Sequence, residues 1–272
     1  MGLCDRFLVI VSATAAVSVK MDIMFSDESP SSRYFLLAGI ALGSLLMVFT
    51  QPPFGQDLGY HRFADQRDFL GLPNFFDVIS SLPFVFVGVA GVSFCLRNRL
   101  GDLRIAWLSF FAGVALVGPG SAFYHWTPSN ASLVLDRLPM TVAFMGLTTA
   151  ILGEYAGARI GKIMLAPALI LGLMSVLYWH WFNDLRLYAW VQFFPLTALP
   201  IVALVFRRRY TGQGSLVIAL VCYVLAKVAE GYDREIFNLT HDLVSGHTLK
   251  HLLAATGGFA ILLMLKNRTR LQ

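Results

Sequence analysis

The last apolar run of the chain opens with the sequence SGHTLKH at residues 245–251 and continues to Leu265. A run of this length can cross a bilayer as an α-helix. His247 and His251 are four residues apart, so a helix places both imidazoles on one face, one turn apart. Polar groups inside a membrane cost free energy unless they are paired. The pair therefore indicates either hydrogen bonds to neighbouring helices and headgroups or the ligation of a metal ion.

The composition is that of a helical membrane protein. Of the 272 residues, 57% are hydrophobic and only 14% are charged, which excludes an ordinary soluble domain and a disordered chain. The apolar residues form continuous runs without the alternation of a transmembrane β-barrel. The formal charge of +5 comes from basic residues in short connections between these runs, so it does not indicate nucleic-acid binding. We therefore predict an all-α, polytopic bundle of transmembrane helices.

Eight apolar runs are candidates for membrane spans, and they divide the chain. The first, at 34–50, is followed by two prolines and stands apart as an extra N-terminal helix. The other seven are expected at 74–96, 103–125, 134–153, 160–179, 186–206, 213–230 and 247–266. These seven form a core over residues 74–272. An N-terminal cytoplasmic segment at 1–33 precedes the extra helix, and an external loop at 51–73 follows it.

Basic residues predict the orientation of the bundle. Clusters follow the second, fourth, sixth and eighth spans, which all end on the same side of an eight-span arrangement. Their members are Arg97, Arg99, Arg104, Arg159, Lys162, Arg207, Arg208, Arg209, Lys266, Arg268 and Arg270. Because short connections rich in Lys and Arg stay in the cytoplasm, we expect both termini there and His247 at the outer end of its helix.

Two further motifs fall at the same outer level. The third span ends with Ser121 and His125, again four residues apart, and the fourth begins with Asp136. Alone, Ser121 would be expected to bond a carbonyl of its own helix, and Asp136 to act as a helix-start charge or to pair with the next arginine. Together, three helices bring His125 to His247 and His251, and three imidazoles with an open position are a catalytic zinc ligand set. A nearby carboxylate can accept a proton from metal-bound water.

The ordered set of motifs resembles the alkaline ceramidase family, within a wider superfamily that includes adiponectin-receptor-like proteins. The resemblance rests on GSAFYH at 120–125, LDRLPM at 135–140 and HTLKH at 247–251. NFFDVISSLPF at 74–84 is also similar to the opening of the family's first core helix. The resemblance implies seven transmembrane helices around an intramembrane zinc site. That site would cleave the amide of ceramide or a related lipid, giving a fatty acid and a sphingoid base.

The resemblance also implies a role for each motif residue. His125, His247 and His251 would hold the zinc. Asp136 would act as general base and later as acid toward the leaving amine. Ser121 would stabilise the oxyanion or help to hold the water.

Two groups near the outer face carry weaker expectations. Some family members bind calcium through an acidic segment ahead of the first core helix. Residues 56–74 offer oxygen ligands here, but their pattern does not align with that segment, so we favour a polar external loop over a Ca²⁺ site. Lys227, Glu230 and Lys250 lie near the level of the histidines, either as an intramembrane ion pair or as contacts to the headgroup of a substrate.

The main functional prediction is a zinc-dependent amidase with a membrane-lipid substrate. The alternative in the same superfamily is a receptor-like protein that binds lipid without efficient catalysis. A bis-histidine haem protein would leave Ser121, Asp136 and His251 without a role, and a proton-coupled transporter should carry more buried carboxylates. We expect the site on the extracytoplasmic side of a bacterial inner membrane, with an ER or Golgi membrane as the alternative. The sequence gives no prediction of oligomeric state.

Overall fold

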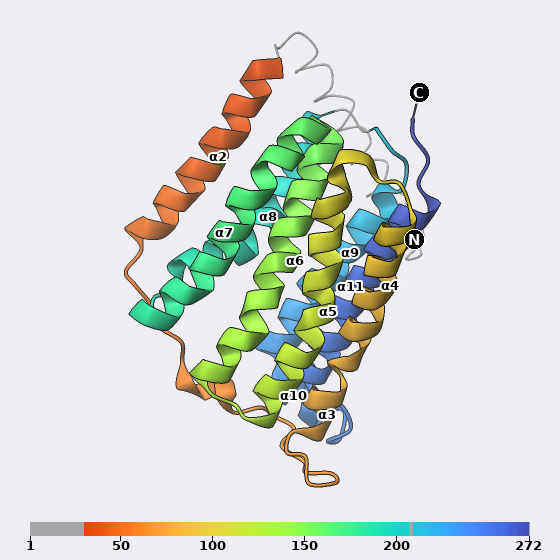
Figure 1. Cartoon of the computed structure of the whole chain (residues 1–272). Helices are drawn as coiled ribbons and strands as arrows, with labels where there is room; N and C mark the ends of the chain where they lie inside the picture. The colour runs from red at the N-terminus through yellow and green to blue at the C-terminus, as the bar shows by residue number, and fades with distance from the viewer. Residues whose placement is uncertain (1–29, 207–208, 272) are drawn as a thin grey trace, which may run out of the picture.

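The computed structural model describes residues 30–206 and 209–271. Most of the predicted segment 1–33 and two arginines of one basic cluster lie outside these residues. The described part is helical and contains eight helices that are long and apolar enough to cross a membrane, which confirms an integral, multi-pass, all-α bundle (Figure 1).

The helices follow the expected order along the chain. The spans are α2 (Pro30–Thr50), α3 (Phe75–Ile79) with α4 (Leu82–Arg97), α5 (Arg104–Trp126), α6 (Asn130–Ala156), α7 (Ala158–Phe182), α8 (Arg186–Val205), α9 (Gln213–Gly231) and α11 (Gly246–Asn267). Three short elements connect them: η1 (Leu58–His61), η2 (Gly101–Leu103) and α10 (Asp233–Leu239).

Helix α2 lies at the edge of the bundle, as Figure 1 shows, and packs against α8. Its apolar window has no buried residue, whereas the windows of α5, α6 and α11 are 50–56% buried. Polar contacts hold it in place, because Trp190 Nε1 donates to Ser44 Oγ at 3.0 Å and the Tyr34 hydroxyl donates to the Ala156 carbonyl at 2.9 Å. The predicted architecture of a seven-helix core with one extra span is therefore confirmed.

Glycines let α4, α5 and α6 approach one another closely. A Cβ placed at Gly88 of α4 would lie 2.2 Å from the backbone nitrogen of Ala115 in α5. A Cβ at Gly120 of α5 would lie 2.4 Å from the Leu135 carbonyl oxygen of α6. Small residues at such contacts are how membrane helices gain van der Waals packing without a hydrophobic driving force between them.

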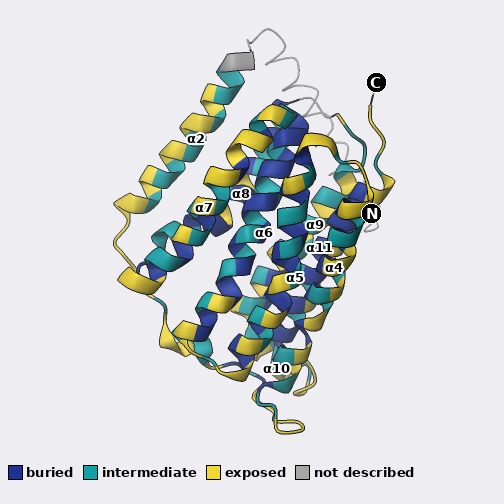
Figure 2. Cartoon of the chain, in the orientation of Figure 1, coloured by how far each residue is buried: buried dark blue, intermediate teal, exposed yellow. Residues whose placement is uncertain are grey.

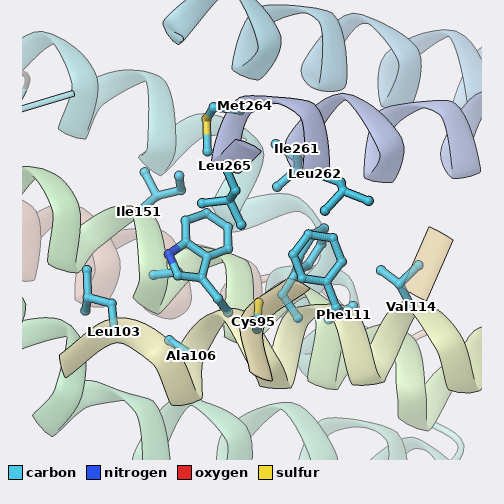
Figure 3. Close-up of a cluster of buried hydrophobic side chains, with 14 of the residues drawn as sticks. Cys95, Leu103, Ala106, Phe111, Val114, Ile151, Ile261, Leu262, Met264 and Leu265 are labelled. Atoms are coloured by element: carbon cyan, nitrogen blue, oxygen red, sulfur yellow. The ribbon is translucent and has the colours of Figure 1, made fainter. Parts of the chain in front are cut away.

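A large apolar cluster fills the interior of the bundle away from the histidines (Figure 2, Figure 3). Phe111 of α5 and Leu262 of α11 are among its fully buried side chains and point toward one another (Figure 3). A buried ion pair between Glu154 and Arg268 lies at the edge of this cluster, where the Glu154 carboxylate also accepts from Trp107 Nε1. The buried polar groups that remain gather toward the other end of the bundle.

Two helix boundaries differ from the sequence prediction. Helix α6 begins at Asn130 instead of 134, because Ser129 and Ser132 form a reciprocal capping box. Asp136 is therefore well inside the helix, and its interpretation as a helix-start charge is wrong. The span predicted at 74–96 is interrupted after Ile79, since Pro83 has no N–H to offer the Ile79 carbonyl.

Candidate metal centre

Three histidines meet between α5 and α11. His125 comes from the last turn of α5, and His247 and His251 come from the first two turns of α11. Each offers one nitrogen, and these atoms lie within 4.8 Å of one another. All three rings are buried, with exposed fractions of 0%, 4% and 3% in chain order. The structure therefore assembles the three predicted ligands into one cluster that could hold a metal ion.

The geometry of this cluster fits zinc. His125 Nε2 and His247 Nε2 lie 3.2 Å apart. Two nitrogens bound to one tetrahedral zinc at about 2.0–2.1 Å would be separated by about 3.3 Å. Lys250 Nζ also lies 2.8 Å from His247 Nε2, but Glu230 offers this ammonium a carboxylate at 3.0 Å, so it can leave the imidazole free.

Ser121 and Asp136 flank the histidines. Ser121 Oγ lies 3.4 Å from His251 Nε2 and 3.1 Å from Ser81 Oγ. Asp136 has an exposed fraction of 8% and faces the Ser121 hydroxyl across the α5–α6 contact. The structure thus brings together all five predicted residues. The expected bond from Ser121 to a carbonyl of its own helix is replaced by contacts between helices.

An acidic and basic cluster extends from His247 toward the outer loops. Glu230 forms ion pairs with Lys227 and Lys250, as the interpretation of these residues as an intramembrane ion pair requires. The Tyr60 hydroxyl donates to Glu230 Oε1 at 2.8 Å. Burial raises the pKa of Tyr60 well above its usual range, so this hydroxyl stays protonated and remains a donor. One carboxylate therefore organises two ammonium groups and a phenol beside the histidines.

The break between α3 and α4 contributes residues to which the sequence prediction gave no role. Ser80 Oγ lies 2.8 Å from His251 Nδ1. Asp77 is fully buried, and its Oδ1 accepts from Thr248 Oγ1 at 2.9 Å and from Ser245 Oγ at 3.2 Å. The adjacent serines and the aspartate were visible in the stretch 74–84, but only the tertiary contact with α11 reveals their partners.

The segment before the first core helix covers the outer side of the cluster. The Phe63 side chain has an exposed fraction of 3%. Its ring centroid lies 4.6 Å from that of His125 and 5.0 Å from that of His247. His61 Nδ1 lies 2.9 Å from the Tyr124 hydroxyl, and the backbone N–H of Ala64 donates to Asp233 Oδ2 at 2.9 Å. These contacts make residues 60–64 a wall of the site.

The comparisons with known proteins give one match. A protein-family model described as Ceramidase matches residues 72–267. This range is most of the chain and contains every helix from α3 to α11. It includes the three histidines, Ser121 and Asp136, but not the wall formed by residues 60–64. A search of curated proteins finds no match.

Proposed function

Because this chain belongs to the ceramidase family, we propose that it is a zinc-dependent intramembrane amidase. Its substrate would be ceramide or a related lipid amide, and its products a fatty acid and a sphingoid base. The observation that carries the proposal is the buried cluster of three imidazoles with a carboxylate and a hydroxyl beside it. Family membership supports a hydrolase of lipid amides, and the cluster supports the metal.

His125, His247 and His251 would hold the ion. Three nitrogen ligands that leave one position open are typical of catalytic zinc. Zinc bound there would lower the pKa of a water molecule to about 7 and so supply hydroxide at neutral pH. The burial of all three rings keeps bulk water away from this position.

Asp136 and Ser121 would handle protons and charge. The Asp136 carboxylate can take a proton during attack on the amide carbon and deliver it to the leaving nitrogen. The Ser121 hydroxyl, close to both His251 Nε2 and Ser81 Oγ, can donate to the carbonyl oxygen as negative charge develops there. An amide needs both services, because its nitrogen leaves only after protonation.

Lys227, Glu230 and Lys250 would contact the polar end of the lipid. They lie beside His247, where a hydroxyl next to the scissile amide would fall. Glu230→Gln is then expected to weaken substrate use while the zinc content stays at the level of the unmodified chain. Loss of zinc in this variant would contradict the assignment.

The orientation proposed from loop charges puts the site on the extracytoplasmic side. A lipid amide lies just below the headgroups, so a site near one membrane surface is reached without crossing the bilayer. A bacterial inner membrane is the proposed location, with an ER or Golgi membrane as the alternative. Accessibility of engineered single cysteines at the two ends of the bundle would test this orientation.

The deciding experiment measures zinc per chain and ceramide hydrolysis in detergent-purified protein. His247→Ala and His251→Ala should lose both. His180→Ala, an exposed histidine on α7, is the matched control and should keep both. Folded protein without zinc would refute the metal mechanism. Zinc without product from a panel of ceramides would favour the receptor-like alternative.

A further inference from the structure

We propose that Ser80 is a positioning residue that fixes the tautomer and orientation of His251, so that His251 Nε2 is free to bind the metal. This inference rests on the proposed function and extends it to a residue outside the predicted ligand set. The evidence is a chain of hydrogen bonds that runs from the α3–α4 break to α11.

The break places Ser80 against the imidazole. Helix α3 ends at Ile79 and α4 begins at Leu82, so Ser80 is in the short turn between them. Its Oγ lies 2.8 Å from His251 Nδ1 and donates to the Asp77 carbonyl oxygen at 3.1 Å. Ser80 is 5% exposed and His251 is 3% exposed. In such a buried place, hydrogen bonds to protein groups decide how the imidazole is oriented.

The direction of each hydrogen bond follows from the donors available. A serine hydroxyl has one hydrogen, and a carbonyl oxygen can only accept. If the Ser80 hydrogen goes to the Asp77 carbonyl, Ser80 Oγ must accept from His251, which places the ring proton on Nδ1. A neutral imidazole protonated at Nδ1 has its lone pair on Nε2. His251 Nε2 is the atom that faces the Ser121 hydroxyl in the candidate site.

Asp77 ties the turn to the helix that carries His251. Its carboxylate accepts from Ser245 and Thr248, and Ser245 is the N-cap residue of α11, whose side chain accepts from the Thr248 backbone N–H. The backbone carbonyl of the same Asp77 accepts from Ser80. One residue thus fixes the separation between the turn and the first turns of α11. Partners of this kind around a metal ligand typically contribute 10–100-fold in metal affinity.

A purely structural role for Ser80 is the competing explanation. A hydroxyl that bonds the carbonyl three residues earlier is common at helix ends. Ser175 offers that arrangement without a histidine, because it is fully buried in α7 and donates to the Gly172 carbonyl at 2.6 Å. Ser175→Ala is therefore a matched control for Ser80→Ala, since both remove a buried hydroxyl from the same kind of bond.

The test is the zinc dissociation constant, measured by competition with a chromophoric chelator in detergent. Ser80→Ala should bind zinc about 10–100-fold more weakly than the unmodified chain. Ser175→Ala should bind it with unchanged affinity, and Ser80→Thr, which keeps a hydroxyl, should recover most of the loss. The absorption spectrum of the Co²⁺-loaded protein should change in Ser80→Ala only, since it reports on the ligand arrangement.

The outcomes separate this inference from the proposed function. Unchanged zinc affinity in folded Ser80→Ala would overturn the positioning role and leave the amidase proposal intact. Absence of zinc from the unmodified chain would overturn the proposed function and this inference together. If Ser80→Ala does not yield folded protein, Ser80→Cys is measured with the same expectation, because a thiol is only a weak acceptor.

Discussion

Gly120→Ala is expected to separate α5 from α6 at the level of the candidate site. The added Cβ would lie 2.4 Å from the Leu135 carbonyl oxygen and 3.4 Å from the Cα of Asp136. Ordinary contacts begin at 3.4 Å, so the two backbones have to part by about 1 Å. Neither contacting atom belongs to a flexible side chain, so the strain cannot be relieved by a change of rotamer.

Two consequences have a calculable size. Overpacking of this kind costs about 1–3 kcal/mol, against about 0.5–1 kcal/mol gained from alanine in a helix. The net loss should lower Tm by a few degrees for a chain of this length. The shift also moves Asp136 relative to Ser121 and His125, and a misplacement of about 1 Å can cost about 100-fold in rate. Ceramide hydrolysis should fall far more than stability does.

The assay heats the detergent-purified variants and measures the fraction that remains monodisperse in size-exclusion chromatography. Gly43→Ala is the control, because Gly43 lies inside α2 and a Cβ there would meet nothing within 4 Å. The control should melt at the same temperature as the unmodified chain or slightly above it. An unchanged Tm and activity in Gly120→Ala would refute the close backbone contact between α5 and α6.

Three further perturbations test other parts of the structure. Tyr60→Phe should reduce activity by the same factor at pH 7 and pH 9, because the raised pKa keeps the hydroxyl a donor to Glu230 over this range; an effect that disappears at pH 9 would contradict this. Phe63→Ala should open the wall of the site, seen as faster removal of zinc by a chelator with little change in Tm. Arg268→Met should lower Tm without lowering the zinc content, because it leaves the buried Glu154 carboxylate without its cation at the far end of the bundle. Equal loss of zinc and stability in this variant would contradict the separation of the two ends.

The prediction from sequence reached the ligands because helix periodicity carries their positions. The spacing of four residues in Ser121–His125 and in His247–His251 places each pair on one face, and loop charges put these faces at one level. Ser80 had no such spacing and faces His251 only because Pro83 interrupts the span near the contact with α11. Sequence reasoning also misjudged the environment of Asp136, since the capping box at Ser129 lengthens α6 by a turn.

The sequence by itself determined the class of fold, the order of the spans and the identity of the five motif residues. These properties depend on apolar length and on period, both of which are local along the chain. Only the tertiary structure decided which nitrogens converge and that one carboxylate holds two lysines and Tyr60. It also decided that Phe63 covers the histidines. Such contacts join residues far apart in the chain, and their geometry follows from how closely glycine-bearing helices approach.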